Sequence, residues 1–170
     1  MPRPEDYQLQ TVQVGGLDAE ALRTALAAEG IQLNAYAESL LRSPAFRTRH
    51  RVETVTLALV SLPWLGLRNG GTFGDIVARA KARKLGLCGL DIAPHLRLTM
   101  LQQPLGPYLT VASAPPGPRE DRPNGFYLRR RTDGLWLRGY AASADHVYAA
   151  EFGTWAFCVA DRVASEGRHS

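Results

Sequence analysis

The chain has 170 residues, of which 45% are apolar and 21% are charged, with 20 Lys and Arg against 16 Asp and Glu. This length suffices for one domain with a sizeable core, and the excess of four positive charges favours acidic partners only weakly. No apolar run approaches the roughly 18 residues of a membrane span, and the N-terminus lacks the apolar core of a signal peptide. We therefore expect a cytoplasmic protein that does not engage a membrane.

The N-terminal part predicts a strand followed by two helices. Residues 7–14 alternate between apolar and polar side chains as a strand does. Asp18 can cap a helix over residues 19–28, and a second helix is expected to begin at Asn34 and to end before Pro44. The two helices should form a helical hairpin. The side chains expected to face inward are Leu22, Leu26, Ile31, Tyr36, Leu40 and Leu41.

The middle of the chain predicts one strand and one helix. Residues 52–62 are rich in β-branched side chains, and Pro63 ends that strand. Thr72 can open a helix, with Asp75 at the position of a capping-box acid. This helix is expected to continue to Leu85 and to stop at Gly86.

From Leu96 onward the pattern changes to strands. Residues 96–101, 108–112 and 155–159 are expected to be strands, and the proline-rich segment 114–124 a mobile loop. Helices that precede antiparallel strands indicate an α+β fold, with N-terminal helices packed on a mainly antiparallel sheet formed largely by the C-terminal half. We expect a single domain over residues 1–164 and a frayed tail over residues 165–170.

Residues 125–140 predict a β-hairpin with Asp133-Gly134 at its turn. With a two-residue loop, Arg131 pairs with Trp136, Arg129 with Arg138, and Tyr127 with Tyr140. These six side chains then share one face, and the other face carries Phe126, Leu128, Leu135 and Leu137. A three-residue loop with Gly134 in a bulge would instead place Arg131 opposite Leu135 and mix the two faces.

The polar face of this hairpin is the clearest functional signal. Interleaved arginines and aromatic rings on a sheet can stack on bases and neutralise phosphates, so we hypothesise a nucleic-acid-binding surface. Cross-strand pairs that only stabilise an exposed sheet face explain the same residues. The residues of this surface are Tyr127, Arg129, Arg131, Trp136, Arg138 and Tyr140. Two basic patches could extend it, namely Arg47, Arg49 and Arg51, and then Arg79, Lys81, Arg83 and Lys84.

His95 is the candidate for catalysis. Paired with Asp91 on one helical turn it could act as a general base, with Cys88 as a nearby nucleophile. A buried or capping histidine explains the same residues. Cys88 and Cys158 lie far apart in sequence and are expected to be buried apolar residues.

No metal or cofactor is expected. His50, His146 and His169 have no metal-binding spacing with each other or with the cysteines. The glycines at 66, 70, 71 and 74 precede a helix, but no Gly-Lys-Ser/Thr and no Gly-x-Gly-x-x-Gly follows.

The segment Leu87–Ala112 contains Leu-Arg-Leu and then Gln-Pro-Leu-Gly, and the hairpin contains Asp-Gly-Leu-Trp-Leu. These motifs resemble a family of bacterial proteins whose members show Leu-Arg-Leu, Gln-Pro-x-Gly and Asp-Gly-x-Trp-Leu over residues equivalent to about 30–160. No activity is established for that family, so the resemblance implies a bacterial cytosolic module and no catalytic or binding residue.

Three functions stay open at this point. The first is a binding or regulatory module whose partner is another macromolecule, with nucleic acid as one candidate. The second is a small enzyme that uses His95 with Asp91 or Cys88. The third is a structural protein that joins other chains through exposed sheet edges.

Overall fold

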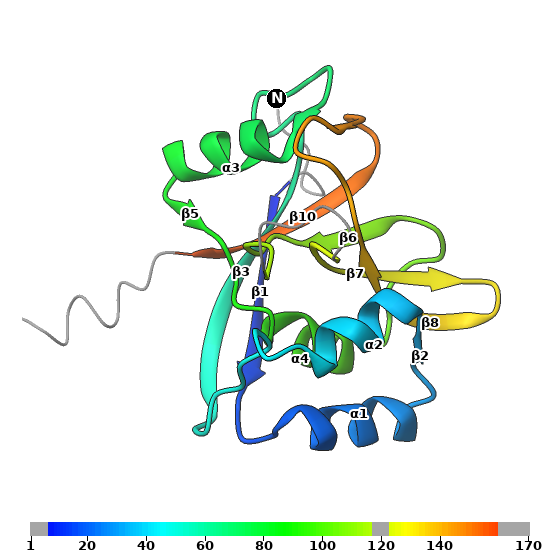
Figure 1. The fold of residues 1–170 in the computed structure, drawn as a ribbon. Coiled ribbons are helices and arrows are strands. Elements are labelled where there is room, and N and C mark those ends of the chain that lie inside the picture. The colour runs from blue at the N-terminus through cyan, green and yellow to red at the C-terminus, as the bar shows by residue number, and fades with distance from the viewer. Residues whose placement is uncertain (1–6, 117–122, 160–170) are drawn as a thin grey trace, which may run out of the picture.

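The computed structural model describes residues 7–116 and 123–159 (Figure 1). The expected frayed tail and much of the expected mobile loop lie outside the described residues. In chain order the elements are β1 (Tyr7–Val14), α1 (Ala19–Ala28), β2 (Gln32–Leu33), α2 (Ala35–Arg42), β3 (Glu53–Ser61), β4 (Gly71–Thr72), α3 (Phe73–Ala82), β5 (Leu85–Gly86), α4 (Ile92–Thr99), β6 (Tyr108–Val111), β7 (Gly125–Arg131), β8 (Gly134–Tyr140), β9 (Val147–Tyr148) and β10 (Gly153–Val159).

One sheet organises the fold, and the expected α+β class is confirmed. Its strand order is β1-β3-β10-β6-β7-β8-β2, and β5 also pairs with β10. All neighbours are antiparallel except β10 with β6 and β2 with β8. The sheet therefore joins the first strand of the described chain to its last, through β3.

The two faces of the sheet are covered to different extents. Helices α1, α2 and α4 pack on one face, where they share a core with alternate residues of β1, β3, β7 and β8 (Figure 1). Helix α3 lies on the other side and packs with the opposite residues of β3 and β10, such as Val60 and Trp155. This second core contains no buried residue of β7 or β8. The hairpin is therefore covered on one face and left partly open on the other.

Local sequence signals explain most of the helix starts. The side chain of Asp18 accepts a hydrogen bond from Ala21 N at 2.8 Å, and that of Asn34 accepts one from Ala37 N at 2.9 Å. Thr72 and Asp75 form the expected capping box. Each cap satisfies an amide that would otherwise have no partner at the helix start.

Asn34 also fixes helix α2 to the hairpin. Its carboxamide accepts from Gly139 N at 2.8 Å and donates to Gly139 O at 2.9 Å. A Cβ atom at Gly139 would lie 2.7 Å from the carbonyl carbon of Tyr36, so only glycine lets the helix lie this close to β8.

Several expectations about these elements were wrong. Tyr36 is 44% exposed, and Ala37 takes its place in the inward stripe of α2. The helical hairpin is interrupted, because Gln32 and Leu33 pair with β8 between the two helices. Helix α3 ends at Ala82 rather than Leu85, since Lys84 adopts a positive φ of 64° and Leu85 joins β10.

The largest error concerns the strand expected over residues 96–101. Those residues belong largely to helix α4, whose first six residues are all buried. In so short a helix the apolar residues Leu96 and Leu98 also alternate as in a strand, and periodicity alone does not distinguish the two in a short apolar run. Arg97, which a strand would turn outward, is instead fully buried.

Arg97 connects α4 to both strands of the hairpin. Its guanidinium donates to Gln103 Oε1 at 2.6 Å, to Trp136 O at 3.2 Å and to Met100 O. Gln103 in turn donates to Leu128 O at 3.0 Å. Burial lowers the pKa of Arg97 to about 10, so the side chain is still a cation at neutral pH.

We predict that Arg97→Leu lowers the free energy of unfolding by about 3–5 kcal/mol, because it leaves buried acceptors without a donor. The matched control is Arg130→Leu, which removes an exposed guanidinium from the same hairpin and should cost less than about 0.5 kcal/mol. Urea denaturation of both variants measures the difference, and equal losses would contradict the role given to Arg97.

Candidate functional site

The hairpin has the expected faces, but its register differs from the expected one. Arg129 pairs with Trp136, Tyr127 with Arg138, and Arg131 with Gly134, so the predicted partners were wrong by two residues. Because side chains alternate with a period of two, a shift by two keeps every residue on its predicted face.

The turn explains the shift. Gly134 has a φ of 124°, whereas Thr132 and Asp133 have no positive φ. An Asp133-Gly134 turn of the predicted kind would need positive φ at both residues. The turn is therefore Thr132-Asp133, and Gln32 Nε2 holds it by donating to Asp133 O at 2.7 Å.

The open face of the hairpin carries the six residues predicted from the sequence, and Tyr108 of β6 joins them. We call these seven side chains the basic-aromatic face. Arg129 lies over the ring of Tyr108 at 4.4 Å and donates to the Tyr108 hydroxyl at 3.0 Å. Arg138 lies over Trp136 at 4.7 Å and donates to the Tyr127 hydroxyl at 2.8 Å. Arginines and rings therefore fix one another in place.

Within the described part of the chain, the positive charge of this face is only partly balanced. Asp133 forms an ion pair with Arg131, with its carboxylate oxygen 4.0 Å from Arg131 Nε. Asp133 also accepts from Trp136 Nε1 at 2.8 Å. Arg129 and Arg138 have no carboxylate partner within the described part of the chain. These two half-exposed cations are placed to attract an anion.

A pocket of about 230 Å³ opens where the basic-aromatic face meets the second core. Rings form most of its wall, and among the described residues no Lys, Arg, Asp or Glu lines it. The lining residues are Tyr108, Thr110, Tyr127, Tyr140, Ala141, Ala142, His146, Tyr148 and Phe152. Tyr108 stacks on Phe152 with ring centroids 4.6 Å apart, and Tyr148 packs edge-on against Phe152 at 5.4 Å. The pocket is therefore held in shape by contacts between its own rings.

One polar group in this pocket has no partner. Thr110 is 2% exposed, and its hydroxyl oxygen makes no hydrogen bond to any described residue. Burial raises the pKa of Tyr140 and of Tyr148, so both phenols stay neutral in the physiological range. The pocket thus offers aromatic walls to an uncharged ring, while the Thr110 hydroxyl oxygen is buried.

The two additional basic patches do not join this face. Arg47 and Arg51 are exposed in the link that precedes β3, on the far side of β10 and β6 from the hairpin. Arg49 forms ion pairs with Glu53 at 3.1 Å and with Asp91 at 3.3 Å. On α3's side of the sheet, Arg83 lies over Trp64 at 4.1 Å. Arg49 and Arg83 therefore have structural contacts of their own.

His95 and Asp91 are both buried, but they do not form the expected pair. His95 Nε2 accepts from Gly15 N at 3.2 Å, and Asp91 pairs with Arg49. Within the described residues, no hydrogen bond joins His95 to Asp91 or to Cys88. Burial lowers the pKa of His95, although Asp91 opposes this shift. The hydrogen bond from Gly15 requires the neutral imidazole, which gives His95 a structural role.

The two cysteines come together despite their separation in sequence. Cys88 is buried as expected, and Cys158 is partly exposed. Their sulfur atoms lie 3.2 Å apart. No cluster of three or more metal-binding side chains occurs in the described ranges.

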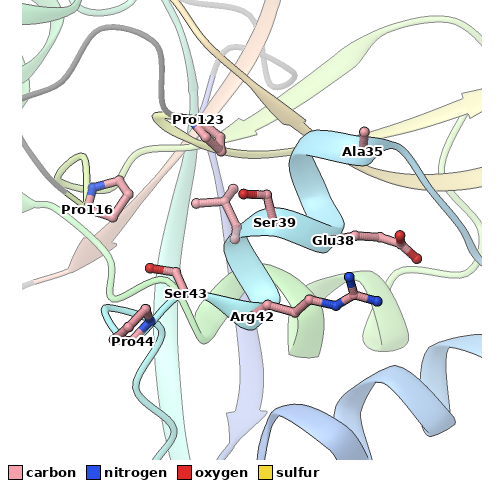
Figure 2. A pocket seen from close by; sticks show the side chains of 9 residues that line it. Ala35, Glu38, Ser39, Arg42, Ser43, Pro44, Pro116 and Pro123 are labelled. Carbon is pink, nitrogen blue, oxygen red and sulfur yellow. The ribbon is translucent and has the colours of Figure 1, made fainter.

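A second hollow lies beside helix α2 and measures about 560 Å³ (Figure 2). Ser39, Glu38, Arg42 and Ser43 line one side, and Pro116 and Pro123 lie across from them. None of the polar side chains named here is buried. Within the described residues, the hollow therefore has no polar group fixed by burial.

Comparison of the chain with protein-family models, with curated proteins and with solved structures found no match. In residues 7–116 and 123–159, no helix combines the length and apolar character needed to cross a membrane.

Sequence reasoning missed the part of the site that lies outside the hairpin. Tyr108 and Thr110 are two residues apart on a predicted strand, so the sequence predicts that they share a face. The pairing of that strand with β7 could not be predicted. Tyr148 and Phe152 come from a segment with no strand pattern. Only the fold brings these four residues around one cavity.

We predict that stability falls as the pH drops below 6.5, the usual pKa of histidine, and through the lowered pKa of folded His95. The sign follows because the unfolded chain binds the proton more readily than the folded one. His95→Gln offers an amide oxygen in place of Nε2 and should reduce this pH dependence. Urea denaturation across this range measures it, and an unchanged pH profile in the variant would contradict the assignment.

Proposed function

We propose that the protein is a binding module for single-stranded nucleic acid, which seats one base in the aromatic pocket and its phosphates on the basic-aromatic face. The observation that carries this proposal is the position of Arg129 and Arg138 beside the pocket. Arg129 stacks on Tyr108 and Arg138 bonds to Tyr127, and both tyrosines line the cavity.

The size and lining of the pocket favour a single planar ring. Its volume of about 230 Å³ lies below the roughly 300–1,000 Å³ of pockets for drug-sized ligands. Aromatic walls favour stacking on such a ring. A nucleobase has this planar aromatic shape.

The neighbouring charges discriminate between possible occupants. Aromatic pockets also hold quaternary ammonium groups, because ring faces attract cations. Here the guanidinium of Arg129 lies over the Tyr108 ring, and that of Arg138 donates to the Tyr127 hydroxyl. Both guanidiniums repel a second cation. A neutral ring attached to a phosphate satisfies both parts of the site.

The extent of the face favours a strand over a free nucleotide. Beyond the pocket, Trp136 and Arg131 continue the alternation of ring and guanidinium towards the turn. Such a row can stack on further bases and follow a phosphate backbone. A duplex keeps its bases paired, so the pocket favours single strands.

We predict that Arg129→Gln combined with Arg138→Gln weakens binding of a fluorescein-labelled oligonucleotide at least about tenfold at low salt. Each lost phosphate contact should also reduce the slope of log affinity against log salt by about 0.7. Fluorescence anisotropy with single-stranded and duplex probes measures both effects, and circular dichroism confirms that the variant is folded.

Arg130→Gln is the matched control, because Arg130 follows Arg129 in β7 and lies on the opposite face. It should leave affinity within about twofold, although it removes as much charge as Arg129→Gln alone. Equal weakening by Arg129→Gln and Arg130→Gln would indicate non-specific attraction. Absence of binding by the unaltered protein at low salt would reject the proposal.

We predict a separate effect for Thr110→Val, which replaces the hydroxyl by a methyl group of similar volume. Stability should stay the same or rise by up to about 1 kcal/mol, because a buried group without a partner is removed. Affinity for the single strand should stay within about twofold, because the hydroxyl oxygen has almost no accessible surface and does not reach a base. A larger loss of affinity in Thr110→Val that Thr110→Ser restores would contradict the burial of this hydroxyl.

A further inference from the structure

Two backbone pairings at the sheet bring Cys88 and Cys158 side by side. Cys158 of β10 pairs with Gly86 of β5, and the chain then turns so that Cys88 bridges to Ser113 beyond β6. The Cys88 amide donates to Ala112 O at 2.7 Å, which fixes its backbone. The two sulfur atoms lie 3.2 Å apart, so they need to approach by only about 1 Å to reach bonding distance.

The surroundings of the two thiols are unequal. Cys88 is 4% exposed, and its hydrogen bond with Cys158, followed by burial, raises its pKa. Cys158 is partly exposed, and its pKa is lowered by the hydrogen bond with Cys88 and by the Arg49 guanidinium. The accessible sulfur is therefore also the one that forms a thiolate more readily.

We infer that Cys88 and Cys158 form an oxidisable dithiol, which hydrogen peroxide or another small hydroperoxide converts into an intramolecular disulfide. The Cys158 thiolate attacks the peroxide, the O–O bond breaks, and Cys158 becomes a sulfenic acid while hydroxide leaves. Cys88 then attacks the Cys158 sulfur, and its thiol proton and the departing hydroxyl leave as water. In sum, one dithiol and one hydrogen peroxide give one disulfide and two water molecules, and a dithiol reductant reverses the change.

The bond would tie the end of β10 to the link between β5 and α4. It would close a loop between positions 88 and 158. A cross-link that closes so long a loop lowers the conformational entropy of the unfolded chain substantially. Oxidation should therefore raise the Tm by about 10 °C. This inference is independent of nucleic-acid binding, because neither cysteine lies on the basic-aromatic face or in its pocket.

The experiment treats reduced, folded protein with a small excess of hydrogen peroxide and then counts free thiols by alkylation after unfolding. We expect both thiols to disappear together, a mass lower by two hydrogens, a cross-linked Cys88–Cys158 peptide, and full reversal by dithiothreitol. Two free thiols after a treatment that oxidises a small-molecule thiol control would overturn the inference. So would disulfides formed only between chains.

Serine variants test the order of the steps. In Cys88→Ser the sulfenic acid on Cys158 cannot be resolved, so dimedone should label it. In Cys158→Ser the remaining Cys88 should react far more slowly, because it is buried. Faster labelling of Cys88 than of Cys158 would contradict the assigned roles, and the thiol count on the unaltered protein stands even if a variant does not fold.

Discussion

The buried guanidinium of Arg97 is the interaction on which the hairpin depends. It binds a backbone carbonyl in β8 directly and one in β7 through Gln103, so a helix end and two strands share one cation. No carboxylate forms an ion pair with it within the described residues, and backbone and amide oxygens balance the charge instead. A buried guanidinium tolerates few arrangements of its neighbours. Each hydrogen-bond acceptor that it loses leaves part of its desolvation cost uncompensated. The hairpin is therefore held in one position on α4, and its other face turns outward.

This arrangement explains why aromatic side chains gather on the open face. Rings run without interruption from the second core to the hairpin, from Trp155 through Tyr148 and Phe152 to Tyr108 and Tyr127. The buried end of this series anchors the exposed end, so the pocket forms before any ligand arrives. A preformed pocket loses little conformational freedom on binding, which favours affinity from a small contact area.

Elements with strong local signals could be predicted from the sequence. The strand over residues 7–14 and the helix over 19–28 follow from alternation and from the Asp18 cap, and the structure has both with those bounds. Helix α4 could not be predicted, because a short and largely apolar segment fits a strand as well as a helix. The site divides in the same way. Alternation placed the hairpin residues on the right face, whereas the pocket and the cysteine pair depend on strand pairing between distant segments, which a single sequence does not reveal.

The three tryptophans lie in three different parts of the molecule. Trp136 lies on the basic-aromatic face, Trp155 packs against Tyr148 of the pocket, and Trp64 stacks on Tyr7 and Arg83, away from both. Their indole N–H signals can be followed by NMR while a short single-stranded oligonucleotide is added to ¹⁵N-labelled protein. Binding of the strand at the basic-aromatic face and its pocket predicts saturable shifts of the Trp136 and Trp155 signals and an unmoved Trp64 signal. A shift of Trp64 alone, or no shift of any of the three, would contradict it.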